Sequence, residues 1–324
     1  MEQIIDAACA EHLDYLITTD HNTLAPRHHE GWHGDTLVLV EEEVTQPANH
    51  LLALNIRDEI VPPISPQQSI DAVLAQGGLA FMAHPFYQGS KLLGDPPIPW
   101  TDWKATGFTG MEIWNFTAEL YESLSEEKEL RPLETYRALM RPKAEVLRTW
   151  DRLQQERRVV GLAGLDAHAE QIVQGGERVT LLPYATIFRT LRMHVLLEHP
   201  FTGSLPDDRR AVYAALRDGH GYIAFEYESP VDSFTFAAVD RTGAIAGVMG
   251  DEFGWKPGMR LSIALPRPAA IRVIRNGETL EEVCGPSLLL SVEEDGCYRV
   301  EVQRDALPWI VSNPIYIRNG RSST

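Results

Sequence analysis

The chain has 324 residues and a hydrophobic content of 44%, which is long and apolar enough for a barrel-sized domain with a smaller partner. Its formal net charge of −17 argues against a broad basic face of the kind that binds nucleic acid. No apolar run reaches the length of about 18 residues that a membrane helix needs, and the first residues lack the pattern of a signal peptide. The three cysteines match neither a disulfide framework nor a metal-binding pair. We therefore expect a cytoplasmic protein that binds neither nucleic acid nor membranes, unless a leader preceded an incomplete N-terminus.

Predicted strands and helices alternate over the first two thirds of the chain. Short apolar runs bounded by turn residues predict strands, and apolar residues at helical spacing predict helices. The predicted strands lie at 15–18, 36–40, 51–54, 79–83, 111–114 and 159–163, and the predicted helices at 2–12, 65–76 and 207–219. Residues 117–157 predict two or three helices outside the sheet, broken near Pro132 and Pro142. This alternation favours parallel βα units.

The pattern changes after residue 228. Short alternating or apolar runs are separated there by turn residues such as Asn276-Gly277 and Asp295-Gly296, and no helical pattern is present. The predicted strands are 234–239, 260–265, 271–274, 288–292 and 298–302. They predict an antiparallel β-sandwich over residues 229–324. Trp309 is interpreted as a core residue of this sandwich, and an anchoring role is the alternative.

Acidic residues and histidines recur where the predicted strands end. The ends of parallel strands meet at one edge of a sheet, where α/β enzymes hold metals and substrates. Imidazole and carboxylate together suit zinc, manganese or iron, and a bridging carboxylate allows two metals close together. The groups are Asp20-His21, Glu41-Glu42-Glu43 with His50, His84-Pro85, Glu112 with Asn115, and Asp166-Ala167-His168. Five such groups in this order predict a metal site.

Several of these residues also have a structural interpretation. Asp20 is either a ligand-like residue or a cap and support for its neighbours. Glu41 and Glu42 are expected to be solvated or to orient other groups, so Glu43 is the favoured ligand of the three. Glu112 is expected to be structural or to face the substrate.

The remaining histidines are less informative. The segment His28–His33 resembles a metal-binding cluster, but a surface loop is the favoured interpretation, and a contact to substrate or to an accessory metal is the alternative. Three further histidines show no partner pattern and are interpreted as structural: His194, His199 and His220.

Taken in order, these motifs resemble the PHP superfamily, the metal-dependent phosphoesterase domains named after polymerase and histidinol phosphatase. The matching segments are Ile17–Thr23, Glu42–Thr45 with Asn49-His50, Ala83–Pro85, Glu112–Asn115 and Gly164–His168. Two segments, Trp150–Leu153 and Pro308–Tyr316, resemble more narrowly the carbaryl-hydrolase-like (CehA/McbA) branch. The resemblance implies an α/β fold. Residues 1–228 would form a distorted (β/α)7 PHP barrel with a helical insertion at 117–157, and residues 229–324 the β-sandwich domain.

The resemblance also implies how metals are shared among the ligands. In the family, Glu43 and Asp166 would bind one metal with two histidines of a His-x-His strand. A second metal would be bound by Glu43, His50 and His84, and a third by His21 and His168 with an aspartate. The His-x-His strand and that aspartate come before the first helix in the family and are absent from this chain, so the barrel would lack its first strand. We expect a misassigned start or a shortened chain rather than a natural loss, and only the second metal keeps all its ligands.

The expected function is metal-dependent hydrolysis of a small molecule by a metal-activated water, with a phosphate ester as the favoured substrate. Hydrolysis of an amide, ester or carbamate is one alternative, and a catalytically weak metal- or ligand-binding protein is another. The expected cofactors are divalent zinc, manganese or iron, up to three ions in the family and fewer here, and a homo-oligomer is left open. The catalytic residues are expected to be Glu43 and Asp166, the metal ligands His21, Glu43, His50, His84, Asp166 and His168, and the supporting or substrate-contacting residues Asp20, Glu112 and Asn115.

Overall fold

The computed structural model describes residues 1–62, 65–91, 93–123, 140–174, 176–227 and 229–318 of a mixed α/β protein. The chain divides into two compact units, each built from several segments. The first comprises Met1–Pro142, Leu162–Arg192 and His199–Tyr213, and the second Lys143–Gly161, Met193–Glu198 and Ala214–Thr324. The sequence-based division between residues 228 and 229 stays a prediction.

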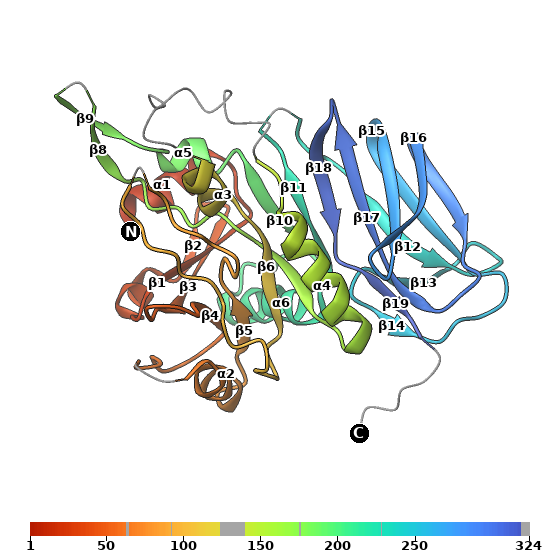
Figure 1. The fold of residues 1–324 in the computed structure, drawn as a ribbon, viewed down its shortest axis with the longest axis horizontal. Coiled ribbons are helices and arrows are strands. Elements are labelled where there is room, and N and C mark those ends of the chain that lie inside the picture. The colour runs from red at the N-terminus through yellow and green to blue at the C-terminus, as the bar shows by residue number, and fades with distance from the viewer. Residues whose placement is uncertain (63–64, 92, 124–139, 175, 228, 319–324) are drawn as a thin grey trace. The chain divides into compact units, whose positions relative to one another are not determined.

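The first unit is organised around a mixed sheet (Figure 1). Across this sheet the strands are β1 (Tyr15–His21), β3 (Thr36–Val44), β4 (Leu51–Leu54), β5 (Leu79–Met82), β6 (Gly110–Asn115) and β7 (Val160–Gly164), and β2 (Gly31–His33) also pairs with β3. As expected for βα units, β1 is parallel to β3 and β5 is parallel to β6. However, β4 is antiparallel to both of its neighbours. The expectation of parallel units was therefore wrong at β4, because the connection 45–50 is too short for a parallel crossover.

Helices of the first unit pack on this sheet as their apolar spacing predicts. In α1 (Glu2–Ala10), Ile5 packs against Val38 and Val40 of β3. Helix α2 (Pro66–Ala75) contacts β4 and β5 and begins with a capping box between Ser65 and Gln68. The other helical segments are η1 (Ala25–His29), α3 (Phe116–Ser123) and α5 (Tyr184–Ile187), while β8 (Gln171–Gln174) and β9 (Glu177–Thr180) form a separate hairpin. Among the described helices of the chain, none is long and apolar enough to cross a membrane.

The second unit contains a larger, mainly antiparallel sheet. Its main path is β10 (Leu191–Val195), β11 (Gly221–Phe225), β18 (Leu307–Ser312), β17 (Gly296–Arg304), β15 (Arg260–Arg275), β12 (Thr235–Val239) and β13 (Ile245–Val248). Three further strands pair beside this path: β16 (Glu278–Ser291) with β15, β19 (Ile315–Ile317) with β17, and β14 (Glu252–Phe253) with β19. The turn residues correctly predicted several of these strands, but β10, β11, β13, β14, β18 and β19 were missed.

Strand β15 joins two segments that were predicted as separate strands, 260–265 and 271–274. Its first part pairs with β12 and its second part with β17, and it pairs with β16 on both sides of an irregularity between Ala264 and Ala269. Pro266 and Pro268 lie within this irregularity. Because proline has no backbone N–H to donate to a ladder, the two prolines interrupt the pairing without ending the strand.

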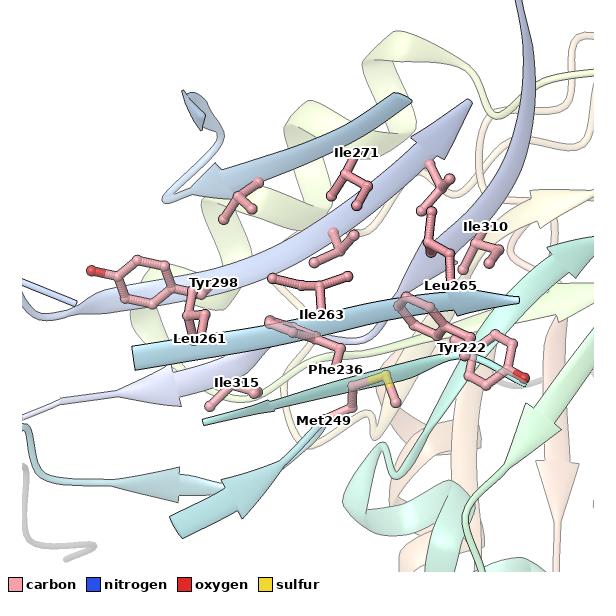
Figure 2. Packing of buried hydrophobic residues seen from close by; sticks show 14 of the residues in the cluster. Tyr222, Phe236, Met249, Leu261, Ile263, Leu265, Ile271, Tyr298, Ile310 and Ile315 are labelled. Atoms are coloured by element: carbon pink, nitrogen blue, oxygen red, sulfur yellow. The ribbon is translucent and has the colours of Figure 1, made fainter. Parts of the chain in front are cut away.

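Buried apolar side chains from these strands form the core of the second unit (Figure 2). Phe236, Leu261, Ile263 and Ile310 are each at most 1% exposed and belong to one cluster. Trp309 is 2% exposed in the same cluster, which confirms its interpretation as a core residue. Its indole Nε1 donates to the backbone carbonyl of Ser229 at 2.7 Å, so its one polar atom is satisfied.

A buried ion pair within the second unit connects helix α4 (Ala144–Glu156) to β17. The Arg299 guanidinium donates to both Asp151 oxygens, at 2.7 and 2.8 Å. Helix α6 (Leu205–Asp218) lies where residues 207–219 predicted one. Helices α3 and α4 bear out the ends of the predicted helical segment 117–157, whose residues 124–139 lie outside the described residues. Two histidines without a sequence-predicted partner have one: His194 contacts Glu226 at 2.9 Å and His220 contacts Asp251 at 3.1 Å.

Candidate metal centre

Three strands of the first unit bring Glu43, His50 and His84 together. Glu43 lies near the end of β3, His50 directly precedes β4, and His84 follows β5. Since β4 runs antiparallel to β3 and β5, its beginning lies beside their ends. The short connection that prevented a parallel crossover therefore also places His50 next to Glu43.

The three side chains form a compact and buried group. Glu43 Oε1 lies 2.7 Å from His50 Nδ1 and 3.4 Å from His84 Nε2. All three side chains are at most 7% exposed, and one ligand atom from each lies within 4.8 Å of the other two. Among the described residues, Glu43, His50 and His84 form the group of acidic residues, histidines and cysteines whose ligand atoms lie close enough together to hold a metal ion.

The hydrogen bonds of His50 fix which of its nitrogens faces the group. Nε2 lies 2.8 Å from the backbone carbonyl of Gln46, and because a carbonyl oxygen only accepts, Nε2 carries the hydrogen. In the neutral imidazole, Nδ1 is then an unprotonated acceptor facing the Glu43 carboxylate, so a proton or a metal ion must lie between them. A carbonyl that orients the far nitrogen is the usual support of a metal-ligating histidine. The donor set therefore fits a divalent ion.

The ionisation of the group follows from its mutual charges. Burial raises the pKa of Glu43, but hydrogen bonds from His50 and His84 outweigh it and hold that pKa well below its usual range. Burial alone would lower the pKa of His84, yet Glu43 together with Asp166 and Glu112 raises it to about 9. Without a metal, the negative charge of the Glu43 carboxylate is therefore balanced by a protonated His84.

His21, Asp166 and His168 form a more exposed rim beside this group. The His21 ring centroid lies 6.0 Å from that of His50 and 5.9 Å from that of His168. His21 Nδ1 is 3.8 Å from Glu43 and 2.5 Å from Thr45 Oγ1. The side chains of His21, His168 and Asp166 are 48%, 41% and 20% exposed. The six sequence-predicted ligands thus lie near one another. Glu43, His50 and His84 are buried, and His21, Asp166 and His168 form a more exposed rim beside them.

Asp166 has a strained backbone. Its φ of 51° lies in the left-handed region that non-glycine residues seldom adopt. Its carboxylate lies 3.4 Å from His168 Nδ1, and this charge outweighs burial and raises the pKa of His168. Strain of this kind is retained where the surrounding structure holds a functional group in place.

The predicted supporting residues differ in their placement. Asp20 is exposed at the end of β1, and its charge adds to burial in raising the pKa of Tyr184. Glu112 and Asn115 are buried in β6, where the Glu112 carboxylate accepts from the backbone N of His84 at 2.6 Å and from Asn115 Nδ2 at 2.8 Å. Burial raises the pKa of Glu112 to about 7.

Glu41 and Glu42 were expected to be solvated or to orient other groups, and the structure contradicts only the first of these alternatives. Both are 0% exposed. Glu41 accepts from Tyr213 Oη at 2.6 Å and from Arg209 at 2.9 Å, and Glu42 accepts from the backbone N of Ile60 at 2.9 Å. Strand β3 is buried on both faces over all nine residues, so each of its carboxylates needs a partner inside the protein.

The histidine-rich segment does not join the centre. The His28 and His29 rings lie 4.1 Å apart in η1, and His33 Nε2 contacts the backbone carbonyl of His29 at 2.8 Å. None of these three residues belongs to the metal-capable group of the described chain. The favoured interpretation of a surface loop was wrong, because the segment includes the end of η1 and all of β2. The alternative, a contact to substrate or to an accessory metal, stays a prediction.

Sequence reasoning missed the groups that support the ligands. Gln46 acts on His50 through its backbone carbonyl and Thr45 contacts His21 through its hydroxyl. Both directly follow β3, which ends at Val44, but the contact of Gln46 is made by its backbone and so leaves no pattern of residue types. Gly164 was quoted only as part of a motif, although its missing side chain leaves room for the Glu112 carboxylate.

No family model matches the chain. The uncharacterized protein MJ1587 of Methanocaldococcus jannaschii is 28% identical over 96 residues, which cover 28% of this chain and 56% of that protein, so the match spans about half its length. A solved two-domain protein from Bacteroides vulgatus, described as containing a predicted PHP-like metal-dependent phosphoesterase, aligns over 96% of this chain and 89% of its own with 13% identity and a TM-score of 0.41. The geometry of the site therefore carries the functional argument.

Proposed function

We propose that this chain is a metal-dependent hydrolase whose ion is held by Glu43, His50 and His84. The observation that carries the proposal is the His50 ring, whose far nitrogen is fixed by the Gln46 carbonyl while Nδ1 faces Glu43 at 2.7 Å. The ordered motifs favour the PHP superfamily and its carbaryl-hydrolase-like branch, with a PHP-type barrel and a C-terminal β-sandwich. Up to three ions, of zinc, manganese or iron, are proposed for a complete family site, and fewer for this chain.

Each residue has a distinct role in this proposal. A divalent ion bound here supplies a Lewis acid that polarises the scissile bond and makes water acidic. Glu43 holds negative charge among the imidazoles, since its pKa is lowered by His50 and His84 despite burial. Asp166 is 20% exposed beside this group, so its carboxylate can accept a hydrogen bond from an entering water and orient it. His21 and His168 present imidazoles at the exposed rim, where a substrate would arrive.

The favoured substrates are small phosphate esters. Rim imidazoles and a divalent ion together favour an anionic group, because both attract its charged oxygens. Amide, ester or carbamate hydrolysis is the alternative reaction at the same site. A binding protein without turnover is favoured if only the buried group of Glu43, His50 and His84 binds an ion and the rim residues bind none.

Turnover measurements separate these alternatives. The wild-type chain with added Mn²⁺ or Zn²⁺ is expected to hydrolyse 4-nitrophenyl phosphate faster than 4-nitrophenyl acetate or an aryl carbamate. His84→Ala is expected to abolish this rate, whereas His199→Ala, which removes an exposed imidazole elsewhere in the first unit, is expected to retain it. Hydrolysis of the acetate or carbamate alone would favour the alternative bond. Metal binding without any turnover would leave the binding protein as the function.

A further inference from the structure

The buried carboxylate of Glu112 contacts the main chain of His84 and the side chain of Asn115. One oxygen, Oε2, accepts two hydrogen bonds, from the backbone N of His84 at 2.6 Å and from Asn115 Nδ2 at 2.8 Å. Glu112 is 4% exposed. It therefore contacts the main chain of a proposed ligand but is buried away from an entering substrate.

The main chain of His84 needs such support. Its φ of 26° lies in the positive region, which is costly for a residue with a side chain. The backbone carbonyl of His84 accepts from the N of Tyr87 at 3.0 Å, and its N–H donates to Glu112. These two bonds hold both sides of the strained residue, and so fix the direction in which the imidazole leaves the chain.

Asn115 fixes Glu112 in turn. Asn115 Nδ2 donates to the carboxylate, while Asn115 Oδ1 accepts from the backbone N of Ala118 at 2.9 Å, at the beginning of α3. The amide of Asn115 is thus held at both ends, and Asn115 is 5% exposed. The Glu112 rotamer is consequently set by the first turn of α3.

Gly164 brings a second strand to the same carboxylate. A Cβ built on Gly164 would overlap Glu112 Oε1 and would lie 3.1 Å from Asn115 Nδ2. Gly164 is the last residue of β7, two positions before the strained Asp166. The carboxylate therefore also packs against the strand end that leads to the rim of the site.

We propose that Glu112 is a positioning residue that fixes His84 relative to the end of β7, which precedes Asp166. Gly164 must then be glycine, because any side chain there would occupy the space of the Glu112 carboxylate. The inference rests on the proposed function, because positioning matters only if Glu43, His50 and His84 hold an ion. Support of this kind affects metal affinity by about ten- to a hundredfold in other metal sites.

Three substitutions distinguish position from charge. Gly164→Ala displaces the carboxylate and changes no charge. Glu112→Ala removes both hydrogen bonds. Glu112→Gln removes the charge but keeps an oxygen that can accept from His84 and Asn115, because both donate to the same atom. Asp151→Asn is the matched control, since it alters a buried and hydrogen-bonded carboxylate in the other unit.

The measurements are the Co²⁺ dissociation constant, the visible spectrum of bound Co²⁺, and hydrogen exchange of the His84 amide in the metal-free protein. Gly164→Ala and Glu112→Ala are expected to weaken Co²⁺ binding about ten- to a hundredfold, to change the spectrum and to speed exchange at His84. Glu112→Gln is expected to remain within about threefold of wild type, as is Asp151→Asn.

Two results would overturn the inference. In the first, Gly164→Ala behaves as wild type while Glu112→Gln is as weak as Glu112→Ala, so that charge rather than position matters. In the second, all four variants retain wild-type affinity, spectrum and exchange. If instead wild type and His84→Ala bind Co²⁺ equally, the proposed function itself fails. Variants that unfold are replaced by Glu112→Gln and the amide-exchange measurement, which still decide between position and charge.

Discussion

At the scale of single residues, the central feature is one carboxylate shared by several imidazoles. A buried carboxylate is unfavourable unless it is paired with a cation or with donors. Glu43 meets this requirement through His50 and His84 at 2.7 and 3.4 Å. His50 Nδ1 cannot be a donor in its neutral form, because its other nitrogen donates to the Gln46 carbonyl. The arrangement therefore needs a proton or a metal ion between His50 Nδ1 and Glu43, and the proposed function assigns the ion.

Glu43→Gln tests this carboxylate without changing its size. The amide retains one oxygen but loses the charge, so we expect metal affinity to fall by more than the ten- to hundredfold typical of a supporting residue. Calorimetric titration with Zn²⁺ measures the change. Glu41→Gln is the matched control, since Glu41 is equally buried on β3 but is bound to Tyr213 and Arg209. Equal loss of affinity in both variants would contradict a specific role for Glu43.

At the scale of elements, the buried pair Asp151–Arg299 connects α4 to β17. The Arg299 side chain is 3% exposed and the Asp151 side chain 9%. Arg299 also donates to Glu301 at 2.6 Å, so without Asp151 the buried guanidinium keeps one carboxylate partner. The loss is therefore expected to stay below the about 3–5 kcal/mol of a fully uncompensated buried charge. The Asp151–Arg299 pair therefore matters to the stability of the second unit mainly because removing Asp151 would leave the buried Arg299 with fewer partners.

Asp151→Asn is expected to lower the free energy of unfolding of the second unit by about 1–3 kcal/mol, because Arg299 loses the charge of Asp151 but keeps Glu301. Calorimetric unfolding that resolves the two units, rather than tryptophan fluorescence, measures this loss, since tryptophans are buried in both units. Arg275→Gln provides the comparison, because its partner Glu294 is 66% exposed and the loss should stay below about 1 kcal/mol. Similar losses in the two variants would show that burial of the pair does not matter.

Helix α1 ends at a pH-dependent contact with the segment after α5. Arg189 donates to both oxygens of Glu11, at 2.6 and 2.7 Å, and this hydrogen bonding lowers the pKa of Glu11 from its usual value. A lowered pKa in the folded state adds stability above the unfolded pKa, and that stability is lost as the pH falls through the folded pKa.

Arg189→Gln should therefore cost stability at pH 7 and progressively less as the pH falls below about 4.3, the ordinary value for glutamate. Arg189 is 63% exposed, so the loss at pH 7 should be at most about 1 kcal/mol. Thermal unfolding of wild type and variant between pH 7 and pH 3 gives this difference. A difference independent of pH would assign the effect to packing instead of to the charge of Glu11.

At the scale of the whole molecule, metal binding should appear as added stability. An ion that binds only the folded state at 100 times its dissociation constant adds about 2.7 kcal/mol. We expect this gain for wild type with Zn²⁺, its reversal by a chelator, and its absence in His84→Ala. Calorimetry must resolve the two units, because a chain with two cores need not unfold in one step. A gain of equal size in His84→Ala would place the ion elsewhere.

The ligand positions could be predicted from the sequence because each lies within a few residues of a strand end. Glu43, His50 and His84 follow this rule, and strand ends are marked by local apolar patterns. The direction of β4 could not be predicted in the same way, since pairing depends on neighbours distant in sequence. The burial of Glu41 was missed for the same reason: Tyr213 and Arg209 are 172 and 168 residues away. Long-range polar contacts leave no local pattern.

The most direct test of the account is the metal content of the purified protein. Wild type and His84→Ala would be equilibrated with Zn²⁺, passed through a desalting column and analysed by elemental mass spectrometry. We predict that wild type retains about one tightly bound ion per chain and that His84→Ala retains far less, because the ion and the folded ligand set are linked. No retained ion in wild type, or the same content in both proteins, would contradict it.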